Sequence, residues 1–509
     1  MQCDRSEELS DELSQVESGA SELQHQAFTR AIAGENSDEG SSAERAAAKE
    51  EDVENEPDSQ SVRLRRTESK LSRVVTGFFS DRMQNERKKL LGKFLLNHLL
   101  LGMLIMAVFS LYWGAMYKRS SHLHKVHVLA VIQDDGGNGG NGGSTSGVAA
   151  AIPQLLERVP GTWHVYNASS FQQRYGVAAD EVDDKIHQLV HKQKYWMSLN
   201  VKPNATNALV ESVRRGSAPA FNSTQYFEVF YESGRDPTNM KSTILPLMLQ
   251  LEALHQNYHA TVYLPAVLQN ASQTMAQAAS NVAQAGRMVY GQIDNRPFSD
   301  YVLLGPLQVG LIYCILLTFF QLALFGPIHG QLGQRLKPLH MLLYRYIIAF
   351  VNYFFLSLFF CLVSLAFQVD YTKTFGRGGF MVAWMSSWLL MAAVGGANEN
   401  MITLVMSVAP QFLGFWMIFW VVLNISPSFY PMDLTNNFYR YGYMTPIYNG
   451  VMIFRVIFLD LYRGELGRNY GILCAWVVVN MALFPFVMKF FVHQKKKEAM
   501  KAAAVRNGS

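Results

Sequence analysis

Six long apolar runs interrupt an otherwise polar chain. Most of them approach the roughly 20 apolar residues that a helix needs to cross a bilayer, and they occupy residues 94–117, 301–325, 339–367, 380–394, 401–423 and 471–492. This pattern predicts an α-helical polytopic membrane protein with six transmembrane helices. One helix precedes a long polar segment, and a five-helix transmembrane domain follows it over residues 301–492. The sequence Gly-Gly-Ala-Asn-Glu-Asn at 395–400 is expected to form the turn between the fourth and fifth helices.

The composition agrees with a membrane protein that also carries polar regions. Hydrophobic residues make up 49% of the 509 residues and charged residues 17%, against about 25% charged residues in soluble domains. A mean hydropathy of only +0.04 indicates substantial polar regions beside the apolar runs. The four cysteines show no spacing typical of a zinc site or a disulfide framework.

Two segments of opposite charge precede the first helix. Residues 1–60 hold 17 acidic and 4 basic residues, and so polar a stretch predicts a disordered acidic tail in the cytoplasm. Residues 61–93 invert the balance, with 10 basic and 3 acidic residues. This basic juxtamembrane segment either binds anionic lipid of the cytoplasmic leaflet or serves only as a topology signal.

Charge and glycosylation motifs predict one orientation. The basic residues before residue 94 and in the tail 493–509 favour cytoplasmic positions for both termini. Charge counting then puts residues 118–300 outside the cytoplasm, where Asn-X-Ser/Thr acceptors can receive glycans. This segment contains four such acceptors, at Asn167, Asn204, Asn222 and Asn270.

The segment 118–300 is long enough to fold as a domain. Strand-like runs are expected at 126–132, 163–166, 195–201 and 226–231, and helical patterns at 148–158, 181–191 and 205–214. Alternation of strands and helices favours a small extracytoplasmic α/β domain between the first and second transmembrane helices. The polar segment 272–292, rich in Ala and Gln, is expected to form a helical stalk that leads into the second span.

The α/β segment offers little catalytic chemistry. His122 and His124 have strand-like spacing, with His127, Asp134 and Asp135 nearby, so they are either part of a metal site or ordinary surface histidines. The Gly/Asn tract that ends at residue 143 lacks the Lys-Ser/Thr pair of a phosphate-binding loop. No catalytic set can be assembled from spacing, so the sequence predicts no enzyme activity, no cofactor, no metal and no nucleic-acid partner.

Several polar residues fall inside the predicted spans. They either hydrogen-bond neighbouring helices or line a path for an amphiphilic substrate, and they are Gln308, Gln321, Asn352 and Asn480. Glu399 has two interpretations of its own. It is a solvated acid of the turn at 395–400, or it is a proton-coupling carboxylate at membrane depth.

The connection between the last two spans, residues 426–469, is unusually rich in apolar residues. Residues 452–461 have apolar positions at helical spacing, with Arg455 and Asp460 available for a polar face. This segment suits a helix that lies in the outer interface of the membrane, or a re-entrant hairpin.

Two sequence blocks resemble a known family. The first is Gly305-Pro-Leu-Gln-Val-Gly-Leu-Ile-Tyr313 with Thr318-Phe-Phe-Gln321, and the second runs from Tyr441 to Gly471 and includes Tyr-Gly-Tyr-Met-Thr-Pro-Ile-Tyr-Asn. They resemble the fungal membrane family named for nitrosoguanidine resistance, over residues 97–492. More distantly, the layout of one span, a large loop and five spans is similar to the membrane half of type-two ABC exporters and to the phage-infection-protein group.

The resemblance implies resistance to small toxic compounds and an effect on lipid distribution. The leading expectation is a protein of the plasma membrane that exports lipophilic compounds or lipids, or reduces their entry. The alternative is a regulator or scaffold that controls lipid asymmetry without transporting anything. The chain has no Gly-x-x-x-x-Gly-Lys-Ser/Thr motif, so ATP-driven export requires a separate ATPase. The expected partners are membrane lipids, a small lipophilic substrate, such an ATPase or a flippase, and a second copy of the chain.

Overall fold

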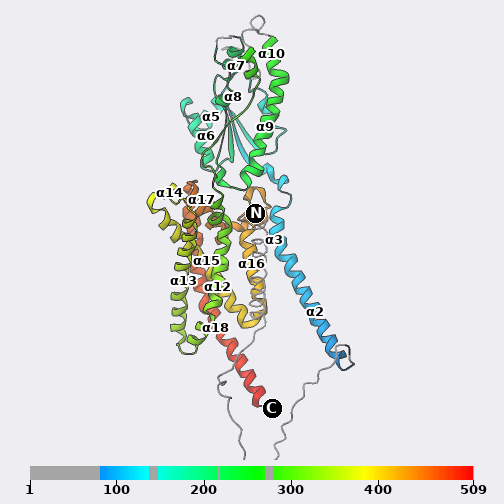
Figure 1. The fold of residues 1–509 in the computed structure, drawn as a ribbon, viewed down its shortest axis with the longest axis vertical. Coiled ribbons are helices and arrows are strands. Elements are labelled where there is room, and N and C mark those ends of the chain that lie inside the picture. The colour runs from blue at the N-terminus through cyan, green and yellow to red at the C-terminus, as the bar shows by residue number, and fades with distance from the viewer. Residues whose placement is uncertain (1–78, 80, 137–146, 215–217, 270–278, 508–509) are drawn as a thin grey trace, which may run out of the picture. The chain divides into compact units, whose positions relative to one another are not determined.

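The computed structural model describes residues 79, 81–136, 147–214, 218–269 and 279–507. The predicted acidic tail, most of the basic juxtamembrane segment, the Gly/Asn tract and Asn270 lie outside these residues. The described part begins with the first apolar helix, continues into an α/β domain and ends in a helical bundle (Figure 1). This is the polytopic helical architecture with an interposed α/β domain that the apolar pattern predicts.

The first apolar segment is helical from Gln84 to Met116. It consists of α2 (Gln84–Leu104), a wider π-type turn (Ile105–Phe109) and α3 (Ser110–Met116). The helix begins ten residues before the predicted span of 94–117, because Arg and Lys are good helix formers and continue the helix into the polar region. Only 6% of its most apolar window is buried against the rest of the chain.

The α/β domain is built on a five-stranded sheet in the order β2-β1-β3-β4-β5. Its strands are β1 (His127–Ile132), β2 (Thr162–Asn167), β3 (Met197–Val201), β4 (Phe227–Tyr231) and β5 (Gly291–Asp294). Strand β1 pairs in parallel with β2 and β3, β3 pairs antiparallel with β4, and β4 pairs in parallel with β5. The first four strands match the predicted runs.

Helices cover both faces of this sheet (Figure 1). Helices α5 (Ala168–Tyr175) and α6 (Val182–His191) cover one face, where Leu129 and Val131 of β1 are buried with Phe171 and Ile186. The opposite face buries the alternate β1 residues against α4 (Ile152–Leu156), α7 (Ala205–Arg214) and α9 (Leu245–Tyr258). Burial of both faces explains why β1 is an uninterrupted apolar run. Short helices α8 (Ser223–Tyr226), α10 (Leu264–Gln269) and α11 (Ala279–Ala285) complete the domain.

The predicted helical stalk over 272–292 is wrong in its described part. Residues 279–285 form the short helix α11, and the chain then enters strand β5 at Gly291. Gly291 is required there because an added Cβ would lie 2.4 Å from the Thr224 carbonyl oxygen. The Ala- and Gln-rich composition favours helix locally, but pairing with β4 adds ladder hydrogen bonds that an isolated stalk cannot make.

The bundle contains the remaining apolar helices. They are α12 (Gly310–Gly333), α13 (Pro338–Ala366), α15 (Gly379–Val408), α16 (Leu413–Ile425), α17 (Pro446–Leu459) and α18 (Leu466–Asn507), with the short α14 (Thr372–Phe375) before α15. With the first segment, five helical segments in the described residues are long and apolar enough to span a membrane, while Pro410–Ile425 and Pro446–Leu459 are shorter. Helix α15 contacts α12, α13, α16, α17 and α18, so it forms the centre of the bundle.

The predicted turn at 395–400 is wrong, because these residues continue helix α15. The two glycines are packing positions: a Cβ on Gly395 would lie 2.5 Å from the Tyr353 ring, and one on Gly396 would lie 2.9 Å from Asn480. Small residues at such points let neighbouring helices approach closely. The chain instead leaves the helix at Ala409, immediately before Pro410, and α16 follows.

Helix α17 is buried rather than interfacial. All but two of its residues, from Pro446 to Leu459, are buried, including Arg455. An interfacial helix would keep one face exposed. The segment is therefore helical as predicted, but protein encloses it.

Candidate functional site

A buried ion pair joins two helices of the bundle. Arg345 of α13 donates from Nε and Nη2 to the same carboxylate oxygen of Glu399 in α15, at 2.9 and 2.8 Å. The two residues are only 7% and 8% exposed. Glu399 is therefore not the solvated turn acid, since it lies within a continuous helix and faces a buried arginine.

A third helix supplies polar groups beside this pair. Asn480 of α18 donates to the Ala393 carbonyl, and Asn400 donates to the Asn480 carbonyl at 3.1 Å. Asn400 also keeps a buried Oδ1 without a partner among the described residues. These contacts place amide groups from α15 and α18 around the ion pair.

A small cavity borders the carboxylate. Its volume is ≈ 30 Å³, and its polar lining comes from Glu399, Asn480, Tyr346 and Tyr353. Apolar side chains, among them Phe350, complete the wall. Since a water molecule needs about 10–15 Å³ of such space, the cavity has room for about two waters.

Of the other predicted intramembrane residues, Gln308, Gln321 and Asn352 do not line this cavity. Gln308 receives a long 3.5 Å contact from Thr238 of the α/β domain. Gln321 is buried within α12. Asn352 of α13 has a buried Nδ2 without a partner among the described residues. Asn480 both joins α18 to α15 and lines the cavity beside Glu399.

Sequence reasoning missed Arg345, although a signal was present. It is a lone arginine within the apolar run 339–367. A charge at that depth requires a partner or a water-filled cavity. Searching for the partner would have drawn attention to Glu399 as a buried acid rather than a loop acid.

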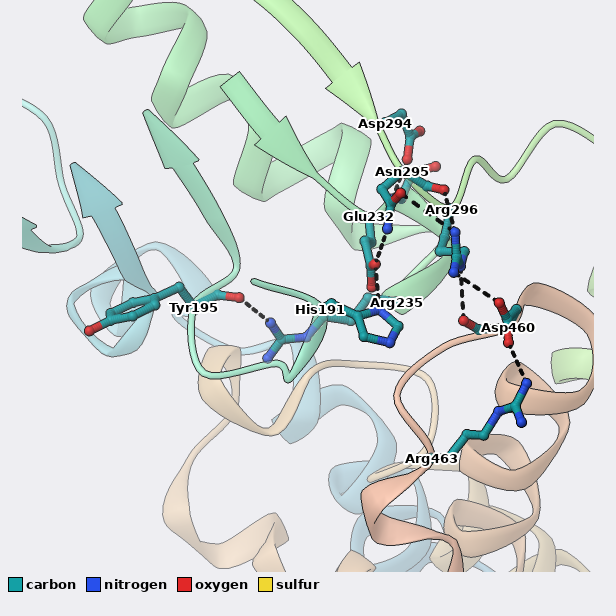
Figure 2. Close-up of polar contacts among 10 residues, drawn as sticks. His191, Tyr195, Glu232, Arg235, Asp294, Asn295, Arg296, Asp460 and Arg463 are labelled. Carbon is teal, nitrogen blue, oxygen red and sulfur yellow. Dashed lines mark hydrogen bonds and ion pairs between the residues drawn. The ribbon is translucent and has the colours of Figure 1, made fainter. Parts of the chain in front are cut away.

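Helix α17 and the residues after it connect the bundle to the α/β domain (Figure 2). Arg296, which follows β5, donates from Nε to the Asp460 carbonyl oxygen and from Nη2 to its carboxylate, both at 2.9 Å. Arg463 donates to the other carboxylate oxygen, also at 2.9 Å. Asp460 ends α17 in the left-handed region, with φ of 52°. Asp tolerates this region better than most residues because its short side chain can hydrogen-bond locally.

A second contact at this junction is buried. Arg455, on α17, donates to the Arg235 carbonyl oxygen at 2.7 Å and lies 3.7 Å from the Asp236 carboxylate. Arg235 itself stacks over the Trp196 ring, 3.6 Å from its centroid. The Trp196 indole in turn donates to Asp433 of the bundle side at 2.8 Å. The junction is thus held by charged and hydrogen-bonded side chains from both parts.

A match to a family model covers most of the chain. Residues 97–482 match the family described as "Protein of unknown function (DUF3533)". The chain belongs to the DUF3533 family. It is 47% identical over 434 residues to the protein named "Uncharacterized endoplasmic reticulum membrane protein YJR015W" of Saccharomyces cerevisiae, an alignment that covers 84% of this chain and 85% of the yeast protein. No solved structure matches it significantly.

In this DUF3533 protein, α6 is fastened to the sheet by a row of polar contacts. His187 contacts Glu228 at 2.6 Å, and one turn further on His191 contacts Glu232 at 2.8 Å. Lys202 reaches the other oxygen of Glu228 at 2.8 Å. The hydrogen bond from His187 and the charge of Lys202 lower the pKa of Glu228 to about 2. Glu232 also receives the Asn295 amide, which connects this row to the junction (Figure 2).

The histidines considered for a metal site do not form one. No group of three or more His, Cys, Asp or Glu side chains with metal-binding geometry occurs among the described residues. His127 pairs instead with His164 of the neighbouring strand, with 3.0 Å between ring nitrogens. Asp134 accepts from the backbone N–H and hydroxyl of Thr206 at the start of α7, so it acts as a capping residue.

Three of the four glycosylation acceptors of the DUF3533 protein are described, and all are exposed. Asn167 and Asn222 precede α5 and α8 and cap these helices, while Asn204 lies just before α7 with φ of 65°. All three stand at helix starts on the surface of the domain, where a glycan can be accommodated without disturbing the core.

Proposed function

We propose that this protein protects cells against small toxic compounds, such as nitrosoguanidine, by exporting lipophilic compounds or lipids. The observation that carries the proposal is the buried Arg345–Glu399 pair between two apolar helices. Charged side chains within membrane-spanning segments are costly and mark substrate or ion pathways by default. The resemblance of residues 305–321 and 441–471 to nitrosoguanidine-resistance proteins supports the same function.

Export requires the helices around the pair to separate. The cavity of ≈ 30 Å³ is far below the roughly 300–1,000 Å³ of sites that hold drug-sized ligands. Glu399 and Arg345 lie on α15 and α13, and Asn480 lies on α18, so opening between these three helices would expose charged and amide groups to an amphiphilic molecule. The proposed conformation change is therefore a widening of the α13–α15–α18 contact.

The proposed partners follow from the same chemistry. Membrane lipids surround the apolar helices, and lipids or small lipophilic compounds are the proposed substrates. ATP-driven export would require a separate ATPase or flippase subunit, since this sequence lacks the phosphate-binding motif. A homo-oligomer is also proposed, because a second copy could complete the surroundings of the exposed first helix.

Reconstitution tests the proposal directly. Purified protein is placed in liposomes, and the movement of a fluorescent lipophilic cation and of fluorescent phospholipids is followed. We expect faster movement than in protein-free liposomes, and a loss of at least tenfold in the Arg345→Gln variant. The matched control is Arg468→Gln, an exposed arginine that forms an ion pair with Glu465 and lies over the Tyr443 ring. Movement equal to protein-free liposomes for every probe would reject export by this protein alone.

A second function, a non-transporting scaffold that controls lipid asymmetry, is favoured by one observation. No residue of α2 is buried, so α2 presents apolar side chains to lipid or to the helices of another protein. Affinity purification of the intact protein from detergent tests this function. Recovery of a flippase that is lost when the exposed α2 residues Leu95 and Leu99 are changed to Trp, and that moves phospholipids in liposomes without this protein, would support the scaffold. A recovered ATPase that moves the probes only together with this protein would support the exporter.

We propose that the protein resides in the endoplasmic reticulum membrane, with both termini in the cytoplasm. The name of the yeast relative supports this location, in place of the plasma membrane expected from the sequence. Microscopy of a tagged chain at its native expression level tests it. Coincidence with a reticulum marker is expected, whereas a continuous peripheral signal without that marker would favour the plasma membrane.

A further inference from the structure

Building on the proposed export function, we propose that Glu399 is a proton-binding site that couples the bundle to a proton gradient. Its carboxylate takes one proton from a hydronium ion that reaches the adjoining cavity and becomes a neutral carboxylic acid. The hydronium ion that gives the proton becomes water, and no carbon bond or oxidation state changes. Protonation breaks the ion pair and leaves Arg345 as an unpaired cation.

The arrangement of the pair suits this exchange. Both arginine nitrogens bind Oε1 of Glu399, at 2.9 and 2.8 Å, and the same carboxylate lines the cavity. One oxygen is therefore committed to Arg345 while the residue still faces space that can hold water. The cavity of ≈ 30 Å³ has room for about two waters, each of which needs polar partners.

The cavity supplies those polar partners. Asn480, Tyr346 and Tyr353 contribute amide and hydroxyl groups to its wall. Water between Glu399 and the polar groups of this wall would be held by them and carry the proton.

Few charged groups face Glu399. Helix α13 contributes Arg345 and the phenols Tyr346 and Tyr353, and α18 contributes only the neutral Asn480. His329 of α12 is also buried, and it lies 3.1 Å from Tyr344, the residue before Arg345. Arg345 is thus the fixed charge that responds when Glu399 becomes neutral, and its release frees α13 to move from α15.

The pair lies near one end of the helices. Arg345 is seven residues after Pro338, the first residue of α13, and Glu399 is nine residues before Val408, the last of α15. At 1.5 Å per residue these separations are about 10 and about 14 Å. Both ends lie on the predicted cytoplasmic side, so the proton reaches Glu399 from, or leaves it toward, that side.

Two measurements on full-length protein test the proposal. The first is infrared difference spectroscopy during pH titration, which detects a carboxylic acid carbonyl without needing transport. We expect a protonation band in the wild type and in the control Glu465→Gln, an exposed acid, and its loss in Glu399→Gln. Identical difference spectra for wild type and Glu399→Gln would overturn the proton site.

The second measurement is accumulation of the fluorescent cation in liposomes with and without a pH gradient. Wild type and Glu465→Gln should accumulate at least tenfold more of the cation with the pH gradient than without it. Glu399→Gln should accumulate the same amount of the cation in both conditions. Should Glu399→Gln fail to fold, the charge-neutral double variant Arg345→Gln/Glu399→Gln replaces it, because it leaves no unpaired charge. Wild-type movement without any gradient dependence overturns coupling but keeps export. No movement at all, with the infrared band intact, rejects export but keeps the proton site.

Discussion

At the scale of single residues, buried charges decide the behaviour of this protein. Removing one member of a buried ion pair leaves an uncompensated charge, whereas replacing both with neutral groups of similar size is often nearly neutral for stability. The Arg345–Glu399 pair is nearly fully buried in the bundle, and Glu228 is nearly fully buried in the α/β domain. The ion pair predicts that one substitution and two substitutions change stability differently. Glu228 predicts that stability differs between two pH values.

Arg345→Gln should destabilise the bundle by about 3–5 kcal/mol, because Glu399 then remains buried without its cation. The double variant Arg345→Gln/Glu399→Gln should recover most of this loss. Thermal unfolding of the detergent-solubilised protein, followed by tryptophan fluorescence, measures both. A double variant that is as unstable as the single one would show that the pair stabilises through shape rather than charge compensation.

The stability of the α/β domain should fall in acid because of Glu228. Its pKa is lowered from 4.5 to about 2 in the folded domain. A depressed folded pKa contributes stability that is present above the unfolded value and is lost as the pH falls toward the folded one. Wild type should therefore lose on the order of 2 kcal/mol relative to Glu228→Gln between pH 6 and pH 2. Parallel pH profiles of unfolding for the two proteins would contradict this assignment.

At the scale of elements, the sequence pattern predicts local structure well and burial poorly. Strand β1 was predictable because both of its faces are covered and its apolar run is nearly uninterrupted. Strand β5 was not predictable in this way, because its sequence Gly-Gln-Ile-Asp is short and mostly polar. The prediction of a turn at 395–400 was wrong because two adjacent glycines are typical of a helix end. In the structure, Gly395 and Gly396 are positions where Tyr353 and Asn480 approach the helix closely. No local pattern distinguishes these two uses of glycine, since the difference lies in residues over forty positions away.

Helix α17 shows that the environment of charged residues is equally hard to predict from local sequence. Arg455 and Asp460 suggested a polar face toward water, but they bind the α/β domain. At the candidate site, the sequence analysis considered Glu399 but did not identify its partner Arg345. A single sequence does not indicate which distant elements pair with each other.

Arg455→Gln should weaken the junction between α17 and the α/β domain by about 3 kcal/mol. The Arg235 carbonyl oxygen loses a charge-assisted hydrogen bond, and the buried Asp236 loses one of its neighbouring cations. Arg468→Gln is the matched control, because that arginine forms an exposed pair within three residues worth less than about 1 kcal/mol. Hydrogen exchange should report faster opening of β5 and of the end of α17 in the first variant alone. Equal protection in both variants would show that Arg455 does not hold the two parts together.

At the scale of the whole molecule, glycosylation reports which side of the membrane holds the α/β domain. If residues 118–300 lie in the lumen, the acceptors at Asn167, Asn204, Asn222 and Asn270 should carry glycans, and enzymatic removal should increase the electrophoretic mobility of the chain. Each Asn→Gln substitution should produce a similar, smaller step. Asn424, which also precedes a Ser/Thr at the second position, should stay unmodified because it is fully buried in α16 and accepts a hydrogen bond from Ile447. A domain that is unglycosylated and is digested by protease added outside sealed microsomes would instead face the cytosol, and the orientation proposed above would be reversed.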